Sequence, residues 1–259
     1  MNTHYNLVTV MGATAGGKTS FAAALAYEIG AEIISADSRQ VYRGMDIGTG
    51  KDLGDYTYKG KKIPYHLIDI ADAGYKYNVF EYQQDFLNAF NDIHARKSFP
   101  VLCGGTGMYI EAVLQGYRLI RVPKNEALRK ALKEKSDAQL SQMLSQYKDL
   151  HNISDTSNRK RLIRAVEIAV YSVDNPDTDI SYPKINSLNF QIVYDRQTRR
   201  ERISKRLKQR MDEGMAEETK ALLDAGVPHE TLLYYGLEYK YITEYLMGNI
   251  PYETMLERL

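Results

Sequence analysis

The sequence has 259 residues, of which 44% are hydrophobic and 26% are charged, with a formal net charge of +1. This composition is typical of a globular protein, and no apolar run approaches the roughly 20 residues that a membrane span needs. The single cysteine, Cys103, excludes an internal disulfide framework and a multi-cysteine zinc site. The first residues show no signal-peptide pattern, so we expect a cytoplasmic protein that does not contact a membrane.

The first half of the chain alternates between strand and helix patterns. Buried strands are predicted at residues 5–12, 31–37, 65–70 and 99–105. Helices are predicted at residues 17–30, 79–97 and 108–116. This alternation is typical of an α/β fold with a parallel sheet that is flanked by helices.

After Gly116 the pattern changes. Polar helices without intervening strands are predicted at residues 126–135, 137–147 and 158–172. A segment rich in Asp, Pro, Asn and Ser at 173–187 is predicted to be a linker or surface loop. A strand at 189–195 and a long helix from Arg199 follow. In that helix an apolar stripe with a spacing of four residues indicates core packing, and it consists of Ile203, Leu207, Met211 and Met215.

The stretch "GATAGGKT" fits the pattern Gly-x-x-x-x-Gly-Lys-Ser/Thr between a predicted strand and a predicted helix. The glycines let backbone N–H groups and the helix N-terminus face an anion, Lys18 neutralises its charge, and the Thr19 hydroxyl can hold Mg²⁺. The sequence therefore predicts a P-loop for a phosphorylated ligand. Its predicted phosphate-binding residues are Gly12, Ala13, Thr14, Ala15, Gly16, Gly17, Lys18 and Thr19.

Two further polar segments follow predicted strands. Asp37, Ser38, Arg39 and Gln40 come at the end of one strand, and Gly104 to Gly107, with Thr106 among them, come at the end of another. Ligands of open α/β sheets lie beyond the carboxyl ends of the strands, so both segments should converge on the P-loop.

The residue types at these strand ends are suited to catalysis and ligand binding, but each segment also has a purely structural interpretation. Asp37 fits a general base, Arg39 a phosphate contact and Gln40 a contact to the edge of a base. The alternatives are a helix cap for Asp37 and Ser38, and a tight turn for the glycines. Cys103 is interpreted as a small buried hydrophobic residue. The P-loop has no clear water-activating acid as partner, because Asp69 is predicted to lie inside a strand.

Positive charge gathers in two segments. Residues 159–164, "RKRLIR", hold four cations, and residues 199–210, "RRERISKRLKQR", hold seven. Such clusters form either solvated helix faces or surfaces that contact nucleic-acid phosphates.

Several stretches together closely resemble the tRNA dimethylallyltransferase (tRNA isopentenyltransferase) family. They are "GATAGGKT", "ISADSRQVYRGMDIGTGK", "IPYHLIDI", "FPVLCGGTGMYIEAVLQG", "NRKRLIRAVEI", "DRQTRRERISKRL" and "GLEYKYITEYLMGNIPYETM". The resemblance covers nearly the whole chain, and the "ADSRQVYRGMDIGT" block is its most specific part. It implies that the P-loop holds the pyrophosphate of dimethylallyl diphosphate. The allyl group would pass to the exocyclic amine of the adenosine that lies 3′ of the tRNA anticodon.

The resemblance also implies roles for individual residues. Asp37 would accept the proton of the amine, and Thr106 would bond the oxygen that bridges the allyl group and the pyrophosphate. Lys18, and Thr19 with Mg²⁺, would stabilise the leaving group, and Arg196 would contact the pyrophosphate. The nucleotide channel would be lined by Ser38, Arg39 and Gln40.

The resemblance divides the chain into a P-loop catalytic core, 1–116 and 187–259, and an inserted helical tRNA-binding domain, 117–186. The insertion would reach the anticodon stem of the tRNA. Its expected tRNA contacts are Arg159, Lys160, Arg161 and Arg164. We expect the protein to act as a monomer.

The sequence departs from the family pattern in a few places. It ends at Leu259, where the family continues with a basic segment that usually holds a Trp, so we expect a shortened chain with weakened tRNA affinity. Gly17 and Gly50, where many members have Ser and Ala, are interpreted as harmless variations. Alternatives to a tRNA prenyltransferase are an enzyme that prenylates free adenine nucleotides, a P-loop kinase of a small metabolite, and an RNA-binding P-loop module without catalysis.

Overall fold

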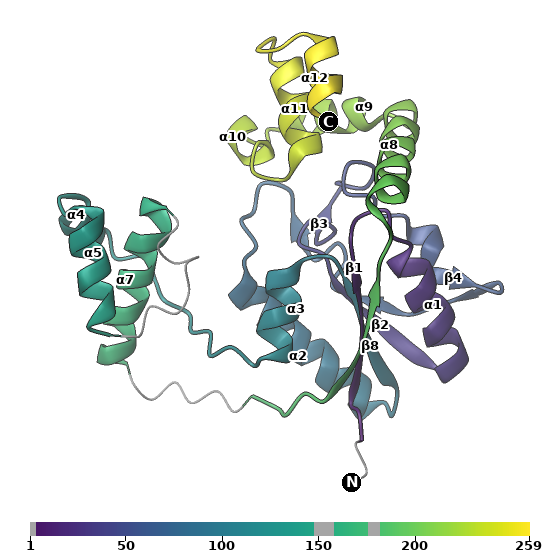
Figure 1. Cartoon of the computed structure of the whole chain (residues 1–259), viewed down its shortest axis with the longest axis horizontal. Coiled ribbons are helices and arrows are strands. Elements are labelled where there is room, and N and C mark those ends of the chain that lie inside the picture. Colours follow the sequence, from purple (N-terminus) through teal and green to yellow (C-terminus); the bar gives the residue numbers. More distant parts are fainter. Residues whose placement is uncertain (1–3, 148–157, 176–181) are drawn as a thin grey trace. The chain divides into compact units, whose positions relative to one another are not determined.

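The computed structural model describes residues 4–147, 158–175 and 182–259 (Figure 1). The chain divides into two compact units, one of residues 1–117 and 183–259 and one of residues 118–182. The sequence pattern placed these divisions after residues 116 and 186. Within the described residues no helix is long and apolar enough to span a membrane.

A five-stranded parallel sheet forms the centre of the larger unit. Its strands lie in the order β6, β2, β8, β1 and β9. Their bounds are Leu7–Gly12 for β1, Ala31–Ala36 for β2, Tyr65–His66 for β6, Phe99–Gly104 for β8 and Ser187–Ile192 for β9. Side chains of β1, β2 and β8 such as Val10, Ile33 and Val101 are completely buried, as expected for a sheet that is covered on both faces. The predicted α/β architecture with a parallel sheet is thereby confirmed.

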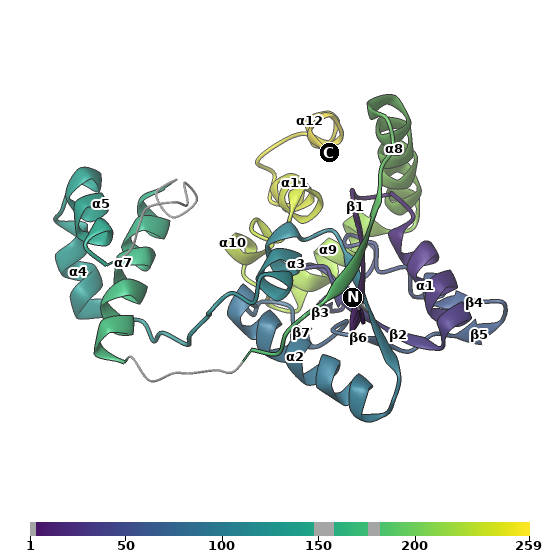
Figure 2. The same ribbon diagram turned by 60° about the horizontal axis from the view of Figure 1, so that its bottom comes forward.

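Helices cover both faces of this sheet, with α1 on one side and α2 and α3 on the other (Figures 1 and 2). Helix α1 is Lys18–Ile29, α2 is Val79–Ala95 and α3 is Gly107–Leu114. The side chain of Asn78 accepts hydrogen bonds from two N–H groups of the first turn of α2, and Glu81 completes the capping box. Helix α1 ends at Gly30, whose left-handed conformation closes the last turn. These local signals explain why the predicted helices form.

One predicted strand is much shorter than expected. Only Tyr65 and His66 of the stretch 65–70 belong to β6, because Leu67 and Asp69 have φ angles of 62° and 55°. Asp69 therefore lies in a turn and not within a strand. The chain also forms two small two-stranded sheets. One pairs β3, Tyr42–Arg43, with β7, Ala71–Asp72, and the other pairs β4, Thr57–Tyr58, with β5, Lys61–Lys62. The 3₁₀ helix η1, Leu53–Tyr56, directly precedes β4.

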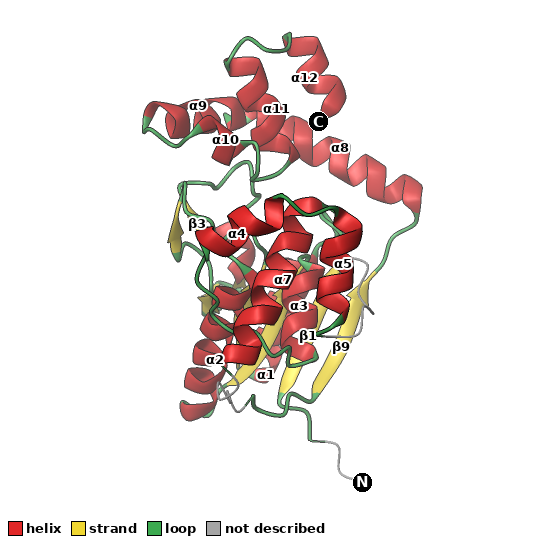
Figure 3. Cartoon of the chain, turned by 90° about the vertical axis from the view of Figure 1, so that its left-hand side faces the viewer, coloured by secondary structure: helices red, strands yellow, loops and turns green. Residues whose placement is uncertain are grey.

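A group of helices follows β9 and lies beyond the carboxyl ends of the central strands (Figures 1 and 3). It consists of α8 Arg196–Asp212, α9 Met215–Asp224, α10 His229–Leu232, α11 Leu237–Leu246 and α12 Tyr252–Arg258. The apolar stripe predicted for one long helix is partly wrong. Leu207 and Met211 of α8 do pack into a core with Met215, but Met215 begins α9 and Ile203 remains 37% exposed.

The smaller unit contains α4 Glu126–Lys133, α5 Asp137–Ser145 and α7 Arg159–Asp174. The three helices bury Leu132, Leu140, Leu144, Leu162 and Val166 against one another. The loop predicted at 173–187 begins later than expected, because Val173 and Asp174 still belong to α7. Residues 176–181 of that loop lie outside the described residues.

Candidate active site

The P-loop connects β1 to α1. A Cβ atom at Gly12 would lie 2.6 Å from the carbonyl oxygen of Ile192 in the neighbouring strand, so this position must be glycine for the two strands to pair. Gly17 has a φ angle of 73° and precedes the first residue of α1. The loop therefore turns directly into the helix and directs the N–H groups of the first turn towards an anion.

Lys18 folds back over the loop, and its Nζ donates to the Ala13 carbonyl oxygen at 2.7 Å. Burial lowers the pKa of the Lys18 ammonium, while the nearby Cys103 and Asp37 act in the opposite direction. Cys103 is itself buried, which raises the pKa of its thiol to about 12. At neutral pH it is a protonated, apolar side chain and not a nucleophile, as the sequence indicated.

A cavity of about 450 Å³ opens in front of the P-loop. It is lined by P-loop residues Thr14 to Ser20, by strand-end residues Asp37, Cys103 and Gly104, and by Gln40, Thr49, Gly50, Asp52, Asp55, Tyr56, Arg202, Lys205, Arg206 and Gln209. Of the two segments predicted to converge on the loop, 37–40 contributes Asp37 and Gln40 to this cavity and 104–107 contributes Gly104. Ser38, Arg39 and Thr106 are not among the residues that line it.

Asp37 and Thr106 lie at the ends of adjacent strands, and backbone contacts connect their segments. The Thr106 N–H donates to the Ala36 carbonyl at 3.1 Å, and the Ser38 N–H donates to Thr106 Oγ1 at 2.9 Å. The Asp37 side chain accepts the Arg39 N–H through Oδ1 at 2.9 Å. Residues 38–41 form a turn without a helix, so the helix-cap interpretation of Asp37 is wrong. The carboxylate is fixed by this turn through one oxygen.

Two further residues of the 37–40 segment, Arg39 and Gln40, have side-chain contacts to other parts of the chain. Gln40 Nε2 donates to the Gly50 carbonyl at 3.1 Å. The Arg39 guanidinium lies 5.4 Å from the centre of the Tyr234 ring, and Tyr234 is 59% exposed. An arginine stacked on an exposed tyrosine presents a planar surface of the kind on which unpaired bases stack.

Helix α8 brings arginines to the P-loop, but not the one that the sequence singled out. Arg202 Nε donates to the Ala15 carbonyl at 2.8 Å, and Arg206 Nη2 donates to the Gly50 carbonyl at 3.0 Å and to Asp52 at 2.9 Å. Arg196 is the first residue of α8 and is not among the residues that line the cavity. Sequence reasoning missed Arg202 and Arg206, although their spacing of four residues marks one helix face.

The two glycine variations differ in their surroundings. A Cβ atom at Gly17 would come no closer than 3.8 Å to Arg202. At Gly50 it would lie 1.4 Å from Nη2 of Arg210 and 2.2 Å from Nη2 of Arg206. The φ angle of 63° at Gly50 strains any other residue, so the interpretation of this position as a harmless variation is wrong; a side chain there would also displace the ends of two flexible arginine side chains.

In the smaller unit Arg159 and Arg164, which the sequence predicts to contact tRNA, form ion pairs with carboxylates of the same unit. Arg159 pairs with Asp137 and donates to the carbonyls of Lys133 and Lys135. Arg164 pairs with Glu167, whose side chain is only 1% exposed. Lys160 and Arg161 are exposed. Arg159 thus connects α7 to α5 and to the end of α4. Arg164 bonds Glu167 within α7 and the Val122 carbonyl ahead of α4.

Glu167 is the centre of that network. Its carboxylate accepts from Arg129, from the Asn125 N–H at 2.7 Å and from Arg164. Burial alone would raise the pKa of Glu167, but these donors outweigh it and lower the pKa to about 2.

Three features define an α/β P-loop protein with a site for a phosphorylated ligand: a parallel sheet, a glycine-rich anion-binding loop with its lysine after β1, and a carboxylate at the end of β2, which β8 separates from β1. The family model described as IPP transferase matches residues 40–259, and that described as isopentenyl transferase matches residues 5–65. The chain belongs to the IPP transferase family.

Individual relatives agree with this assignment. The chain is 57% identical to a protein named tRNA dimethylallyltransferase 2 of Bacteroides fragilis and 56% identical to one of the same name from Phocaeicola vulgatus, over 98% of this chain and 83% of each relative. The crystal structure of a full-length tRNA isopentenylpyrophosphate transferase from Bacillus halodurans matches with a TM-score of 0.67 and 31% identity, over 98% of this chain and 82% of that one. A eukaryotic dimethylallyltransferase acting on tRNA has the same fold, with a TM-score of 0.73 at 18% identity, over 98% of this chain and 66% of that one.

Proposed function

We propose that this enzyme transfers the dimethylallyl group of dimethylallyl diphosphate to the exocyclic amine of the adenosine that lies 3′ of the anticodon in tRNA, and releases pyrophosphate. The observation that carries the proposal is the single cavity that joins the P-loop to Asp37. The names of its relatives support tRNA as the substrate, and its family makes it a prenyltransferase.

The diphosphate is held by the N–H groups of the P-loop and by Lys18, with Arg202 and Arg206 of α8 lining the same cavity. Breaking the bond between the allylic carbon and oxygen leaves the electron pair on the pyrophosphate. Cations and N–H groups that are already in position stabilise that charge as it develops. The Thr106 hydroxyl, which accepts from the Ser38 N–H at 2.9 Å and donates to the Ser38 hydroxyl at 3.2 Å, would bond the bridging oxygen. Arg196 remains a predicted diphosphate contact, and its position at the start of α8 makes it a weaker candidate than Arg202.

The adenine nitrogen forms the new bond to the allylic carbon and loses a proton. Asp37 would accept that proton, because one of its oxygens is bonded to the Arg39 N–H and the carboxylate lines the cavity. Ser38, Arg39 and Gln40 would line the path of the base. The adenosine must leave its stack, which costs a few kcal/mol and is easiest in an unpaired loop such as the anticodon loop.

Prenyltransferases of this kind use a divalent metal ion, and we propose Mg²⁺. The residues present fit such an ion, since the Thr19 hydroxyl at the start of α1 is a hard oxygen donor that lines the cavity beside Lys18. A bound Mg²⁺ would neutralise charge on the diphosphate.

The smaller unit, with Lys160 and Arg161 on its surface, is proposed to contact the anticodon stem. Arg159 and Arg164 would contribute mainly by keeping the helices in place. Phosphate contacts of this type make binding weaker as the salt concentration rises.

The test is to incubate the protein with Mg²⁺, dimethylallyl diphosphate and unmodified tRNA whose anticodon is followed by adenosines, and to analyse the nucleosides by mass spectrometry. Prenylated adenosine should form with wild-type protein and be lost in Asp37→Asn. Product from AMP but not from tRNA would indicate the adenine-nucleotide enzyme. Binding of tRNA and diphosphate without any product would indicate the non-catalytic module, and either result would overturn the proposal.

A further inference from the structure

Residues 45–52 form a loop, here called the 45–52 loop, that contributes Thr49, Gly50 and Asp52 to the cavity. Its central group is the Gly50 carbonyl oxygen, which accepts Gln40 Nε2 at 3.1 Å and Arg206 Nη2 at 3.0 Å. One backbone oxygen thus orients a side chain on the nucleotide side of the cavity and a side chain on the diphosphate side. The direction of this carbonyl therefore influences both binding functions.

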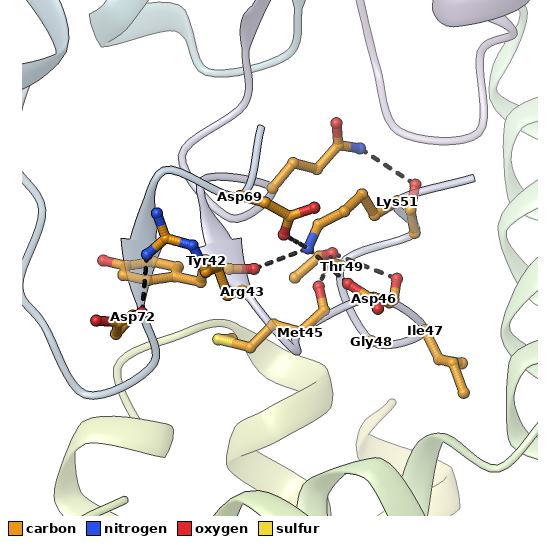
Figure 4. A network of polar contacts seen from close by, with 12 residues as sticks. Tyr42, Arg43, Met45, Asp46, Ile47, Gly48, Thr49, Lys51, Asp69 and Asp72 are labelled. Carbon is orange, nitrogen blue, oxygen red and sulfur yellow. Dashed lines mark hydrogen bonds and ion pairs between the residues drawn. The ribbon is translucent and has the colours of Figure 1, made fainter. Parts of the chain in front are cut away.

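The residue after Gly50 is a buried lysine. The Lys51 side chain has no exposed surface, and its ammonium donates to the Tyr42 carbonyl at 2.7 Å, to Asp46 at 2.6 Å and to Asp69 at 2.5 Å. Figure 4 shows the lysine pointing into this set of acceptors. An ammonium has three hydrogen atoms to donate, so the three bonds use its full capacity.

The contacts of Lys51 close a ring around Gln40. The Asp69 N–H donates a hydrogen bond to the Gln40 carbonyl at 3.1 Å, and the Asp69 carboxylate accepts one from the Lys51 ammonium. Lys51 follows Gly50 in the chain. The Gly50 carbonyl in turn accepts from the Gln40 side chain, which completes the ring. Fixing the Lys51 side chain therefore fixes the peptide unit between Gly50 and Lys51 relative to Gln40.

The beginning of the same loop is held by a different residue. Glu218 of α9 accepts the N–H groups of Asp46, Ile47 and Gly48 at 2.7 to 3.0 Å, and Tyr239 donates to it at 2.7 Å. These contacts end two residues before Gly50. The peptide unit between Gly50 and Lys51 is held by the Lys51 N–H, which donates to the Asp46 carbonyl at 2.9 Å. The Lys51 ammonium bonds the side chain of the same residue, so the backbone and the side chain of Lys51 together hold the Gly50 carbonyl in place.

We propose that Lys51 is a positioning residue that acts through the Gly50 carbonyl to orient Arg206 for the diphosphate and Gln40 for the nucleotide. The proposal rests on the proposed function, in which Arg206 holds the diphosphate. Lys51 itself contacts neither substrate, because its side chain is completely buried.

The experiment is a double-mutant cycle with Lys51→Met and Arg206→Met, in which the affinity for pyrophosphate with Mg²⁺ is measured by calorimetry. We expect Lys51→Met to weaken binding about tenfold, the effect of losing roughly one charge-assisted hydrogen bond. In the Arg206→Met background the same change should have almost no further effect, because the group on which Lys51 acts is already gone. The matched control is Lys59→Met, an exposed lysine paired with Glu28, which should leave the affinity unchanged.

Removing the Lys51 ammonium leaves the Tyr42 carbonyl without its buried donor and the partly exposed carboxylates of Asp46 and Asp69 without their cation, which can destabilise the fold. The double variant Lys51→Met with Asp69→Asn removes one of those charges and should show the same loss of affinity. Thermal unfolding of each variant separates a loss of folded protein from a loss of affinity. The same cycle run with Gln40→Ala in place of Arg206→Met, and with the KM for tRNA as the readout, tests the nucleotide side.

Additive effects of Lys51→Met and Arg206→Met would overturn the inference, as would a lower melting temperature with wild-type affinity. Wild-type protein that binds pyrophosphate but forms no prenylated adenosine would overturn the proposed reaction, while the pyrophosphate cycle would still test Lys51. Wild-type protein that does not bind pyrophosphate would overturn both.

Discussion

Replacing Gly50 by alanine tests the role of the arginines of α8 directly. The φ angle of Gly50 is +63°, a conformation that costs an alanine about 1 kcal/mol more than a glycine. The new Cβ would lie 1.4 Å from Nη2 of Arg210 and 2.2 Å from Nη2 of Arg206. Both guanidinium groups must therefore move, since the backbone of a left-handed turn has little freedom to shift.

Two separable losses follow from this change. The backbone cost should lower the melting temperature by about 3 °C, which corresponds to about 1 kcal/mol in a domain of this size. Moving the end of the Arg206 side chain breaks its bond to the Gly50 carbonyl. Such a contact contributes about 1.5 kcal/mol, so we expect the affinity for pyrophosphate with Mg²⁺ to fall about tenfold.

The matched control is Gly60→Ala. Gly60 has a φ angle of +74° in the turn between β4 and β5, and a Cβ atom there would have no neighbour within 4 Å. Both variants bear the backbone cost, but only Gly50→Ala displaces arginines. Calorimetric titration of both variants with pyrophosphate distinguishes the two effects. Equal affinities in the two variants would refute the assignment of Arg206 to the diphosphate.

Three further predictions concern other parts of the chain. The pKa of Glu167 is lowered to about 2, so its ionised carboxylate stabilises the fold at pH values above its ordinary pKa. The free energy of unfolding of the wild-type protein should therefore decrease by about 2 kcal/mol from about pH 6 to about pH 3. Urea unfolding of Glu167→Gln should lack this decrease, and the same pH dependence in both proteins would contradict the prediction. Lys160→Ala should weaken tRNA binding a few-fold and reduce the salt dependence of binding by about one phosphate contact, whereas Arg159→Ala should mainly lower the melting temperature. Titrations with tRNA at several salt concentrations and thermal unfolding check both variants. The reverse pattern would show that the roles of the two residues are exchanged. Thr106→Val should lower kcat at least tenfold with little change in KM, while Thr106→Ser, which keeps the hydroxyl, should retain activity. Steady-state kinetics that show an unaltered kcat for the valine variant would exclude a role of Thr106 in the chemical step.

The sequence predicts well those parts of the fold that local signals determine. The P-loop follows from glycine and lysine spacing, and the strands β1, β2 and β8 follow from continuous apolar runs. The stretch 65–70 looks similar, yet only two residues pair, because Asp69 turns out of the strand to meet Lys51. An ion pair between residues 18 positions apart leaves no mark in the local pattern.

The same distinction holds for the candidate site. Asp37 and Gly104 were placed at one cavity from the rule that strand ends of a parallel sheet converge. Arg196 is predicted as a pyrophosphate contact from the family resemblance, but it lies in a segment with several arginines. The sequence does not determine which of these arginines faces the P-loop. That choice depends on how α8 is rotated about its axis when it packs, which its apolar contacts at Leu207 and Met211 decide.

The pairing of β9 with β1 has a consequence for how the protein folds during synthesis. The side chain of Asn6 is bonded to the backbone of Asn186, a residue 180 positions later, and Gly12 lies against Ile192. The ribosome therefore releases the complete phosphate-binding loop long before the edge strand that supports it exists. Until residue 192 has emerged, the nascent chain exposes the open edge of β1, whose unpaired N–H and C=O groups can pair with non-native strands. Closure of this edge is a contact of very high sequence separation, so we expect it to be a late and slow step in forming a binding-competent chain.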